Sequence, residues 1–178
     1  MLPTNDFDIL VSVSNQLKNS YMRGYDDPWV SSPFAWIKTR PSRQVGKIGE
    51  QLIAAWCQQR GITVSRSGDS EADMVFNGKR IEVKFSTLWG SRVYTFQQIR
   101  DQNYEYAVFL GISPNEAHCW FVTKTLLRQY VIGHVPQHAG KAGSDTFWLT
   151  FQVDNPPDWL RPFGGTLSQA FDVMTKNL

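Results

Sequence analysis

The chain has 178 residues, of which 42% are hydrophobic and 13% are aromatic, and its formal net charge is +2. This composition excludes a disordered protein and is sufficient for one domain with a sizeable core. The basic bias is compatible with a nucleic-acid partner but is too weak to indicate one by itself.

The sequence shows no sign of export or membrane insertion. No run approaches the roughly 18 apolar residues that a membrane helix needs, so no membrane partner is expected. Asp6 and Asp8 stand where a signal peptide would be basic. Cys57 and Cys119 have no metal-ligand spacing and imply no disulfide scaffold. These features predict a cytoplasmic protein.

The N-terminal part of the chain is predicted to hold two helices joined by an aromatic connector. Residues 5–22 are partly periodic, and residues 23–36 combine aromatic residues with prolines. Residues 41–61 form the second predicted helix, with Ser42 as its N-cap and Gly61 at its end. Its expected core stripe has spacings of three and four and consists of Val45, Ile48, Leu52 and Trp56.

The rest of the chain alternates between strand and helix signals. The clearest is a strand pair around Asn77-Gly78, the preferred two-residue hairpin turn. Residues 95–103 are predicted to form a short helix and residues 133–146 a polar loop. The other expected elements are strands over 61–66, 106–112, 118–124 and 147–153, and helices over 124–132 and 165–178. From residue 42, the order of helix, three strands, helix and two strands predicts a mixed α/β fold on a central sheet.

The strand "KRIEVKFST", residues 79–87, has an apolar face and a polar face. Alternation with period two places Glu82, Lys84 and Ser86 opposite the apolar residues. One interpretation is a solvated sheet face on which Glu82 and Lys84 form a weak pair, worth roughly 0 to 1 kcal/mol. The hairpin register favours another interpretation.

The two-residue turn at Asn77-Gly78 fixes which residues face each other in the hairpin. Phe76 is expected opposite Lys79, and counting back from the turn places Asp73 opposite Glu82 on one face. Like charges so close are destabilising unless a cation lies between them or one carboxyl group is protonated. Lys84 points to the same face. Oxygen ligands favour Mg²⁺, for which Mn²⁺ is expected to substitute, and the chemistry that this set favours is phosphodiester hydrolysis.

A helical glutamate, a carboxylate at the end of a strand and a Glu-x-Lys after a short hairpin together resemble the PD-(D/E)XK nuclease superfamily. The motif residues are Glu50, Asp73 and Glu82-Val83-Lys84, and the resemblance covers about residues 42–124. Ala72 stands at the position of the namesake proline of the family. The resemblance implies a restriction-endonuclease-like core, with a central mixed β-sheet flanked by helices.

The same resemblance implies roles for the motif residues. Asp73 and Glu82 would bind the metal together with the backbone carbonyl of Val83. Lys84 would act on the attacking water, and Glu50 would assist or hold a second metal. A different reading remains open for Glu71, which falls opposite Lys84 in the expected register and would be a ligand or a salt-bridge partner if the hairpin slipped.

Further residues are candidates for DNA contact. Arg40, Arg43 and Lys47 lead into the Glu50 helix and would grip phosphates near its N-terminus. Gln97, Gln98 and Arg100, with Gln102 and Asn103, would face the substrate from the helix predicted over 95–103. For both groups the alternative interpretation is an exposed polar helix face. A third group, His138 and Lys141, lies in the polar loop. The three histidines lack zinc-ligand spacing.

The most specific expectation is a single-domain Mg²⁺-dependent DNA endonuclease of the type II restriction kind. Residues 1–41 would form an N-terminal helical and aromatic extension, residues 42–124 the catalytic core, and residues 125–178 a C-terminal loop, strand and helix. Cutting both strands of double-stranded DNA with one site per chain implies a homodimer. No nucleotide fingerprint occurs, and no nucleotide cofactor is expected. The alternatives are a repair nickase or junction resolvase on the same core, or a non-catalytic DNA-binding domain.

Overall fold

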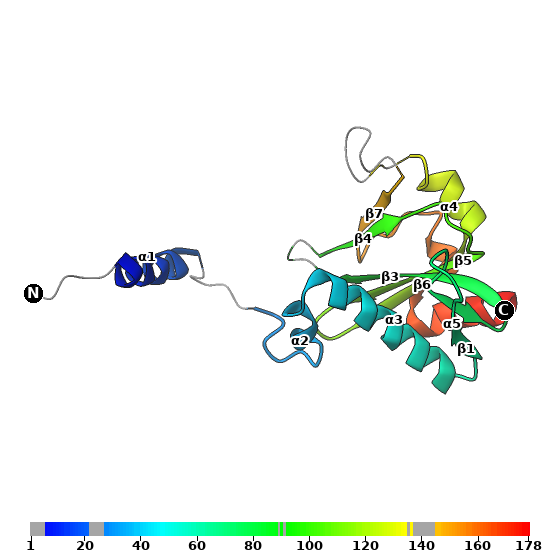
Figure 1. The fold of residues 1–178 in the computed structure, drawn as a ribbon, viewed down its shortest axis with the longest axis horizontal. Coiled ribbons are helices and arrows are strands. Elements are labelled where there is room, and N and C mark those ends of the chain that lie inside the picture. Colours follow the sequence, from blue (N-terminus) through cyan, green and yellow to red (C-terminus); the bar gives the residue numbers. More distant parts are fainter. Residues whose placement is uncertain (1–5, 22–26, 89, 91, 135, 137–144) are drawn as a thin grey trace, which may run out of the picture.

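The computed structural model describes residues 6–21, 27–88, 90, 92–134, 136 and 145–178. Its strands form a central six-stranded sheet and a separate two-stranded sheet, which we call the ribbon (Figure 1). The helices are α1 (Asp6–Tyr21), α2 (Ala35–Lys38), α3 (Ser42–Gln59), α4 (Lys124–Tyr130) and α5 (Leu167–Asn177). The strands of the central sheet are, in spatial order, β1 (Val64–Arg66), β2 (Met74–Phe76), β3 (Lys79–Thr87), β5 (Tyr106–Ile112), β6 (Ala117–Thr123) and β8 (Gly164–Thr166). The ribbon consists of β4 (Val93–Ile99) and β7 (Phe147–Gln152).

The central sheet is mixed, as expected. Strands β1, β2 and β3 are antiparallel, β3 runs parallel to β5, and β5, β6 and β8 are again antiparallel. The hairpin register is confirmed, because Phe76 faces Lys79 and Met74 faces Ile81. The turn residues Asn77 and Gly78 have φ angles of 46° and 86°, which are the values that this hairpin turn requires. The chain is therefore a mixed α/β protein with a central sheet.

The prediction of a helix over residues 95–103 is wrong, because this segment belongs largely to strand β4. Tyr94 and Phe96 alternate as a strand requires, but the register with β7 shifts between Phe96 and Ile99. Gln98 lies in that shift with a φ of 56°. The β-bulge adds one residue, so the buried side chains of Phe96 and Ile99 are three apart. That spacing is also the spacing of a helix.

Two hydrophobic cores lie on opposite faces of the central sheet. On one face, α3 and α5 pack against the sheet through residues that include Ile53, Cys57, Ala170 and Met174. On the other face, the ribbon and α4 pack against β5 and β6 (Figure 1). This second core is strongly aromatic, and its buried residues include Tyr94, Phe96, Phe109, Trp120 and Phe151. Because β7 and β8 belong to these sheets, the C-terminal segment completes the same fold.

Helix α3 is rotated relative to the stripe expected from its sequence. Its buried residues are Gly49, Ile53 and Cys57, and the expected core residues Val45, Ile48, Leu52 and Trp56 are only half-buried. The reason is Gly49, at which a Cβ atom would lie 2.3 Å from the Cβ atom of Phe85 on β3. The helix therefore approaches the sheet most closely along its glycine.

The ends of the helices are partly as expected. Pro41, and not Ser42, is the N-cap of α3, and no side chain caps it. Gly61, with a φ of 89°, follows the C-cap residue and stops the helix as predicted. Helix α5 begins with a capping box between Thr166 and Gln169. The three-residue strand β8, directly before it, was not expected from the sequence.

Helix α1 confirms the expected N-terminal helix, and its apolar side chains are exposed. Phe7, Leu10, Leu17 and Tyr21 all have more than half of their surface exposed, at 68%, 67%, 52% and 82%. The two hydrophobic cores do not include them. Among the described residues, no helix combines the length and the hydrophobicity that crossing a bilayer would require.

Candidate functional site

Glu82 and Lys84 lie on the face of β3 that the ribbon covers. In the parallel register with β5, Glu82 faces Ala107 and Lys84 faces Phe109, and these two partners belong to the aromatic core beneath the ribbon. The Nζ atom of Lys84 lies 2.6 Å from Oε1 of Glu82, and only 15% and 7% of these side chains are exposed. The pair is therefore buried, which is the opposite of the solvated surface pair considered above.

Asp73 directly precedes β2, at the point where the pairing of β2 with β3 stops and leaves the edge of β3 open to side chains. Its N–H donates to the carbonyl of Ile81 at 3.0 Å, and its Oδ2 accepts from the N–H of Val83 at 2.8 Å. The ladder pairing ends at Met74 and Ile81, so Asp73 replaces the next ladder bond with its carboxylate. The N–H and C=O of one strand residue point to the same side. The carbonyl of Val83 therefore faces the same edge as the Asp73 carboxylate.

The Asp73 and Glu82 carboxyl groups converge, as the register predicted. Burial is the largest cause that raises the pKa of Glu82, and the charge of Asp73 and a side-chain hydrogen bond to it raise the pKa further. The neighbouring Lys84 ammonium acts in the opposite direction. The Asp73 carboxylate thus opposes ionisation of Glu82, which is the condition that a bound cation relieves.

Glu50 reaches the same place from helix α3. The contact of Gly49 with Phe85 sets the helix against β3, and Glu50 is the next residue. Burial raises the pKa of Glu50 and Asp73 raises it further, whereas Lys47, Arg66 and Lys84 lower it. The Glu50 carboxylate is therefore close enough to Asp73 and Lys84 for the charges of both residues to act on it. The structure brings together all four residues predicted to be catalytic: Glu50, Asp73, Glu82 and Lys84.

The oxygen atoms of Asp73, Glu82 and the Val83 carbonyl are candidate ligands for a metal ion. Within the described part of the chain, no three or more His, Cys, Asp or Glu residues are grouped so that they would hold a metal ion on their own. Two converging carboxylates and the Val83 carbonyl are nevertheless hard oxygen donors. Mg²⁺ is commonly held by one or two carboxylates and keeps several waters, so these residues fit it.

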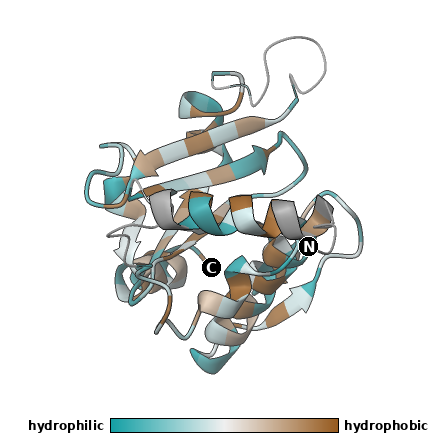
Figure 2. Cartoon of the chain, turned by 90° about the vertical axis from the view of Figure 1, so that its left-hand side faces the viewer, coloured by the Kyte–Doolittle hydropathy of each residue, from teal (hydrophilic) through white to brown (hydrophobic). Residues whose placement is uncertain are grey.

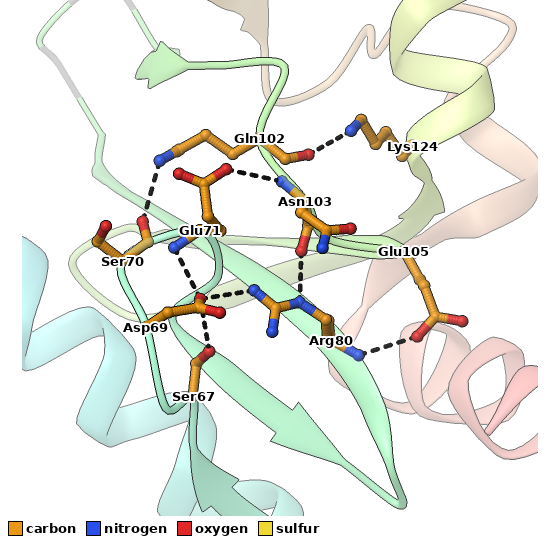
Figure 3. A network of polar contacts seen from close by, with 9 residues as sticks. All are labelled: Ser67, Asp69, Ser70, Glu71, Arg80, Gln102, Asn103, Glu105 and Lys124. Carbon is orange, nitrogen blue, oxygen red and sulfur yellow. Dashed lines mark hydrogen bonds and ion pairs between the residues drawn. The ribbon is translucent and has the colours of Figure 1, made fainter.

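The loop that carries Asp73 is fixed by a polar network that the sequence did not reveal (Figure 3). Asp69 Oδ1 accepts hydrogen bonds from Arg80 Nη2 at 2.6 Å, from the N–H of Glu71 at 2.9 Å and from Ser67 Oγ at 3.2 Å. The Arg80 contact lowers the pKa of Asp69 to about 2. Arg80 and Glu82 are two residues apart on β3 and so share a face of the strand. This alternation is the one sequence signal that could have suggested a role for Arg80 near the site.

The same network joins the Asp73 loop to the turn before β5. Glu71 Oε2 accepts from the N–H of Asn103 at 3.2 Å, and Gln102 donates to the carbonyl of Ser70 at 2.9 Å. Lys124 of α4 donates in turn to the carbonyl of Gln102. Gln102 and Asn103 are thus structural residues rather than part of a helix facing the substrate. Glu71 is not the partner of Lys84, which pairs with Glu82.

The predicted DNA-contacting residues lie in several places. Arg40 and Arg43 are exposed at the start of α3, and Lys47 Nζ lies 3.9 Å from Glu50 Oε2. Gln97 and Gln98 are exposed on strand β4 instead of a helix, and Arg100 directly follows the strand. His138 and Lys141 lie outside the described residues.

Comparisons with known proteins find similarity among solved structures. No family model matches the chain, and no curated protein matches it. Among solved structures, the chain is similar to that of a bacterial homing endonuclease, I-Ssp6803I, at 15% sequence identity and a TM-score of 0.49. The similarity covers 76% of this chain and 94% of that one. At this level it assigns no role to any residue of the chain.

Proposed function

We propose that this protein is a metal-dependent endonuclease that hydrolyses phosphodiester bonds in DNA. The observation that carries the proposal is the convergence of Asp73 and Glu82 at the open edge of β3, with the Lys84 amine 2.6 Å from Glu82. Glu82 is buried, and Asp73 and Lys84 are partly buried. Two carboxylates and one amine placed in this way cost stability unless they serve a bound cation or a reaction.

Each residue of the set has a role in this proposal. Asp73, Glu82 and the Val83 carbonyl would hold Mg²⁺, or Mn²⁺ in its place, and Glu50 would assist or contribute to a second ion. The bound ion would supply positive charge beside the phosphate and so stabilise the transition state. Lys84 would act on the attacking water in one of two ways. As an ammonium it would orient the water by donating a hydrogen bond and would offset negative charge on the phosphate. As a neutral amine it would take a proton from the water and become the ammonium that offsets this charge.

DNA as the substrate is supported by the cations beside the site. Arg43, Lys47 and Glu50 are spaced by four and three residues on α3, so the two cations share a side of the helix with the carboxylate. Cations placed there contact backbone phosphates and position a duplex without reading its sequence. Among the possible reactions we propose restriction-type cleavage of double-stranded DNA, with nicking by a repair enzyme or cleavage of branched DNA as the alternatives that product analysis separates.

Cleavage of both strands requires two sites, and we propose that α1 provides the dimer interface. Its exposed stripe consists of Phe7, Leu10, Ser14, Leu17 and Tyr21, at alternating spacings of three and four. These are the spacings of a coiled-coil seam. Read from either end, the stripe is aromatic, leucine, serine, leucine and aromatic. Such a surface is complementary to an antiparallel second copy of itself, which is the symmetry of an isologous dimer.

Digestion of a supercoiled plasmid tests the proposed function. Purified protein in Mg²⁺ should convert the plasmid to linear or open-circular product, and EDTA should abolish the reaction. Sequencing of the product ends then distinguishes double-strand cleavage from nicking. Lys84→Ala protein serves as the control for contaminating nucleases. If wild-type and Lys84→Ala preparations were equally inactive while both bound DNA, the chain would be a non-catalytic DNA-binding domain.

A further inference from the structure

The ribbon formed by β4 and β7 has one apolar face and one polar face. The apolar face packs on the central sheet through Tyr94, Phe96, Leu149 and Phe151. The alternate residues point the other way, and the bands of hydrophobic and paler residues along the two uppermost strands in Figure 2 show this alternation. The outward positions include Thr95, Gln97, Thr150 and Gln152.

Val93 and Trp148 also occupy outward positions and are half-buried, and the other outward side chains are hydrogen-bonding groups without charge. Gln97, Thr150 and Gln152 are exposed, and Thr95 is half-buried. Thr95 and Thr150 are direct cross-strand partners, with their Oγ1 atoms 3.4 Å apart. A solvated sheet face usually includes Lys and Glu, and residues that only grip phosphates are mostly Arg and Lys. Threonine and glutamine are instead side chains that read base edges.

The ribbon begins beside the candidate site. The backbone N–H of Thr95 donates to Ser86 Oγ at 3.0 Å. Ser86 lies on the same face of β3 as Glu82 and Lys84, two residues beyond Lys84. This hydrogen bond ties the base of the polar face to the strand that carries the proposed catalytic residues.

The β-bulge changes how the glutamines are presented. Without it, Gln97 and Gln98 would point to opposite faces of β4, and one of them would be buried. With the shift at Phe96–Ile99 and a φ of 56° at Gln98, both side chains are exposed. A positive φ at a residue other than glycine is unfavourable, and bulges of this kind often re-aim a side chain next to a functional site.

We infer that the ribbon reads base edges in the major groove of the DNA that the protein cleaves. The inference rests on the proposed function. The major groove, about 12 Å wide, admits a two-stranded β-ribbon. Glutamine can bond an adenine through two hydrogen bonds, and the threonine methyl group can contact that of thymine. With the duplex at the edge of β3, the ribbon determines the sequence that is cut, and Arg43 and Lys47 hold the backbone.

Selection from a randomised DNA duplex library tests this inference. Every protein in the experiment carries Lys84→Ala, so that bound duplexes are not cleaved. In this background, Gln97→Ala with Thr150→Ala should lower the preference at one or more base pairs by roughly ten-fold or more. The matched control is Gln58→Ala with Thr175→Ala, exposed residues of α3 and α5, and it should keep the preference. The salt dependence of binding should be the same for both, because no phosphate contact is removed.

A second variant keeps the inference testable if the alanine changes destabilise the ribbon. Gln97→Glu retains the size of the side chain but makes it an acceptor only, so the preferred base pair should change toward one that offers a cytosine amino group.

Three results would overturn the inference. Unchanged preference in both ribbon variants would overturn it while leaving the proposed function intact, and so would a wild-type enzyme that cuts without sequence preference. A wild-type protein that neither binds the library nor cuts a plasmid in Mg²⁺ would refute the proposed function, and the ribbon inference with it.

Discussion

At the scale of single residues, separate substitutions of Lys84 and Glu82 test whether the site is catalytic. If Lys84 acts on the attacking water, Lys84→Ala should reduce the single-turnover cleavage rate by roughly 10² or more and should spare DNA binding. Glu82→Ala should in addition raise the Mg²⁺ concentration that gives half-maximal rate, because it removes a ligand. Rates measured against Mg²⁺ concentration check both expectations. Cleavage by Lys84→Ala at the wild-type rate would show that the pair is structural.

The convergence of Asp73 and Glu82 also predicts an effect on stability. Asp73→Asn keeps an oxygen that can accept from the Val83 N–H but removes a charge. In EDTA at neutral pH we expect the variant to be as stable as the wild type or more stable, by up to about 1 kcal/mol. Mg²⁺ should raise the melting temperature of the wild type more than that of the variant. A large loss of stability in EDTA would show that Asp73 is needed as a structural charge.

The raised pKa of Glu82 gives this prediction a pH dependence. A carboxyl group whose pKa is higher in the folded chain than in the unfolded chain favours folding while it is protonated. That contribution is fully present below the unfolded pKa and is lost as the pH rises through the folded pKa. Asp73 is one cause of the shift, so Asp73→Asn should lose less stability than the wild type as the pH rises. Melting temperatures in EDTA between about pH 4 and about pH 8 measure the difference.

The proximity of Asp73, Glu82 and Lys84 could be predicted because it depends on local order in the chain. The turn at Asn77-Gly78 fixes the register, and the register alone brings Asp73 toward Glu82. The exact position of Asp73, bonded to the backbone of Val83 and not simply opposite Glu82, depends on β2 beginning only at the next residue, Met74. The contacts of Asp69 and Glu71 with distant residues could not be predicted, because nothing in the sequence marks which polar groups meet across the fold.

At the scale of elements, the packing of α3 on β3 makes a matched test possible within one helix. Gly49→Ala would place a methyl group 2.3 Å from the Cβ atom of Phe85, so we expect a loss of about 1–3 kcal/mol in stability. Gly46→Ala, one turn earlier, meets no atom within 4 Å and should stabilise the helix by roughly 0.5–1 kcal/mol. Urea unfolding of both variants provides the comparison.

Cleavage rates of the two glycine variants distinguish a displaced Glu50 from a general loss of stability. Gly49→Ala displaces the part of α3 that carries Glu50, so its cleavage rate should fall even at temperatures at which it is fully folded. Gly46→Ala should cleave as the wild type does. Equal activity of the two variants would mean that Glu50 does not need its position against β3.

The two errors of prediction at this scale, in β4 and in α3, arise where large side chains do not determine the packing. A strand with a bulge and a helix both place apolar residues three apart, so β4 had the periodicity of a helix. In α3 the line of closest approach follows Gly49, a residue that adds nothing to a hydrophobic stripe. Periodicity therefore predicted elements that pack through large side chains. It was misleading where a bulge or a glycine determines the packing.

At the scale of the whole molecule, the stripe on α1 predicts a dimer. Leu10→Asp places a charge in the centre of the stripe and should convert the protein to a monomer, as measured by light scattering during size-exclusion chromatography. Ser12→Asp adds the same charge on the opposite side of the helix and should leave the dimer intact. The monomer should still nick DNA but should lose concerted double-strand cleavage. A wild-type protein that is monomeric at every concentration tested would contradict the proposed interface.

The order of strands also has a consequence for synthesis of the chain. Strand β4 lies between β3 and β5 in the sequence, but its partner β7 follows only after α4. Until Phe147–Gln152 have left the ribosome, β4 is an unpaired edge with Tyr94 and Phe96 without their β7 partners. We therefore expect that the face of β3 bearing Glu82 and Lys84 is covered only late in folding, and that chains truncated before β7 aggregate. A chain assembled in this order could not complete the surroundings of Glu82 and Lys84 before β7 has been synthesised.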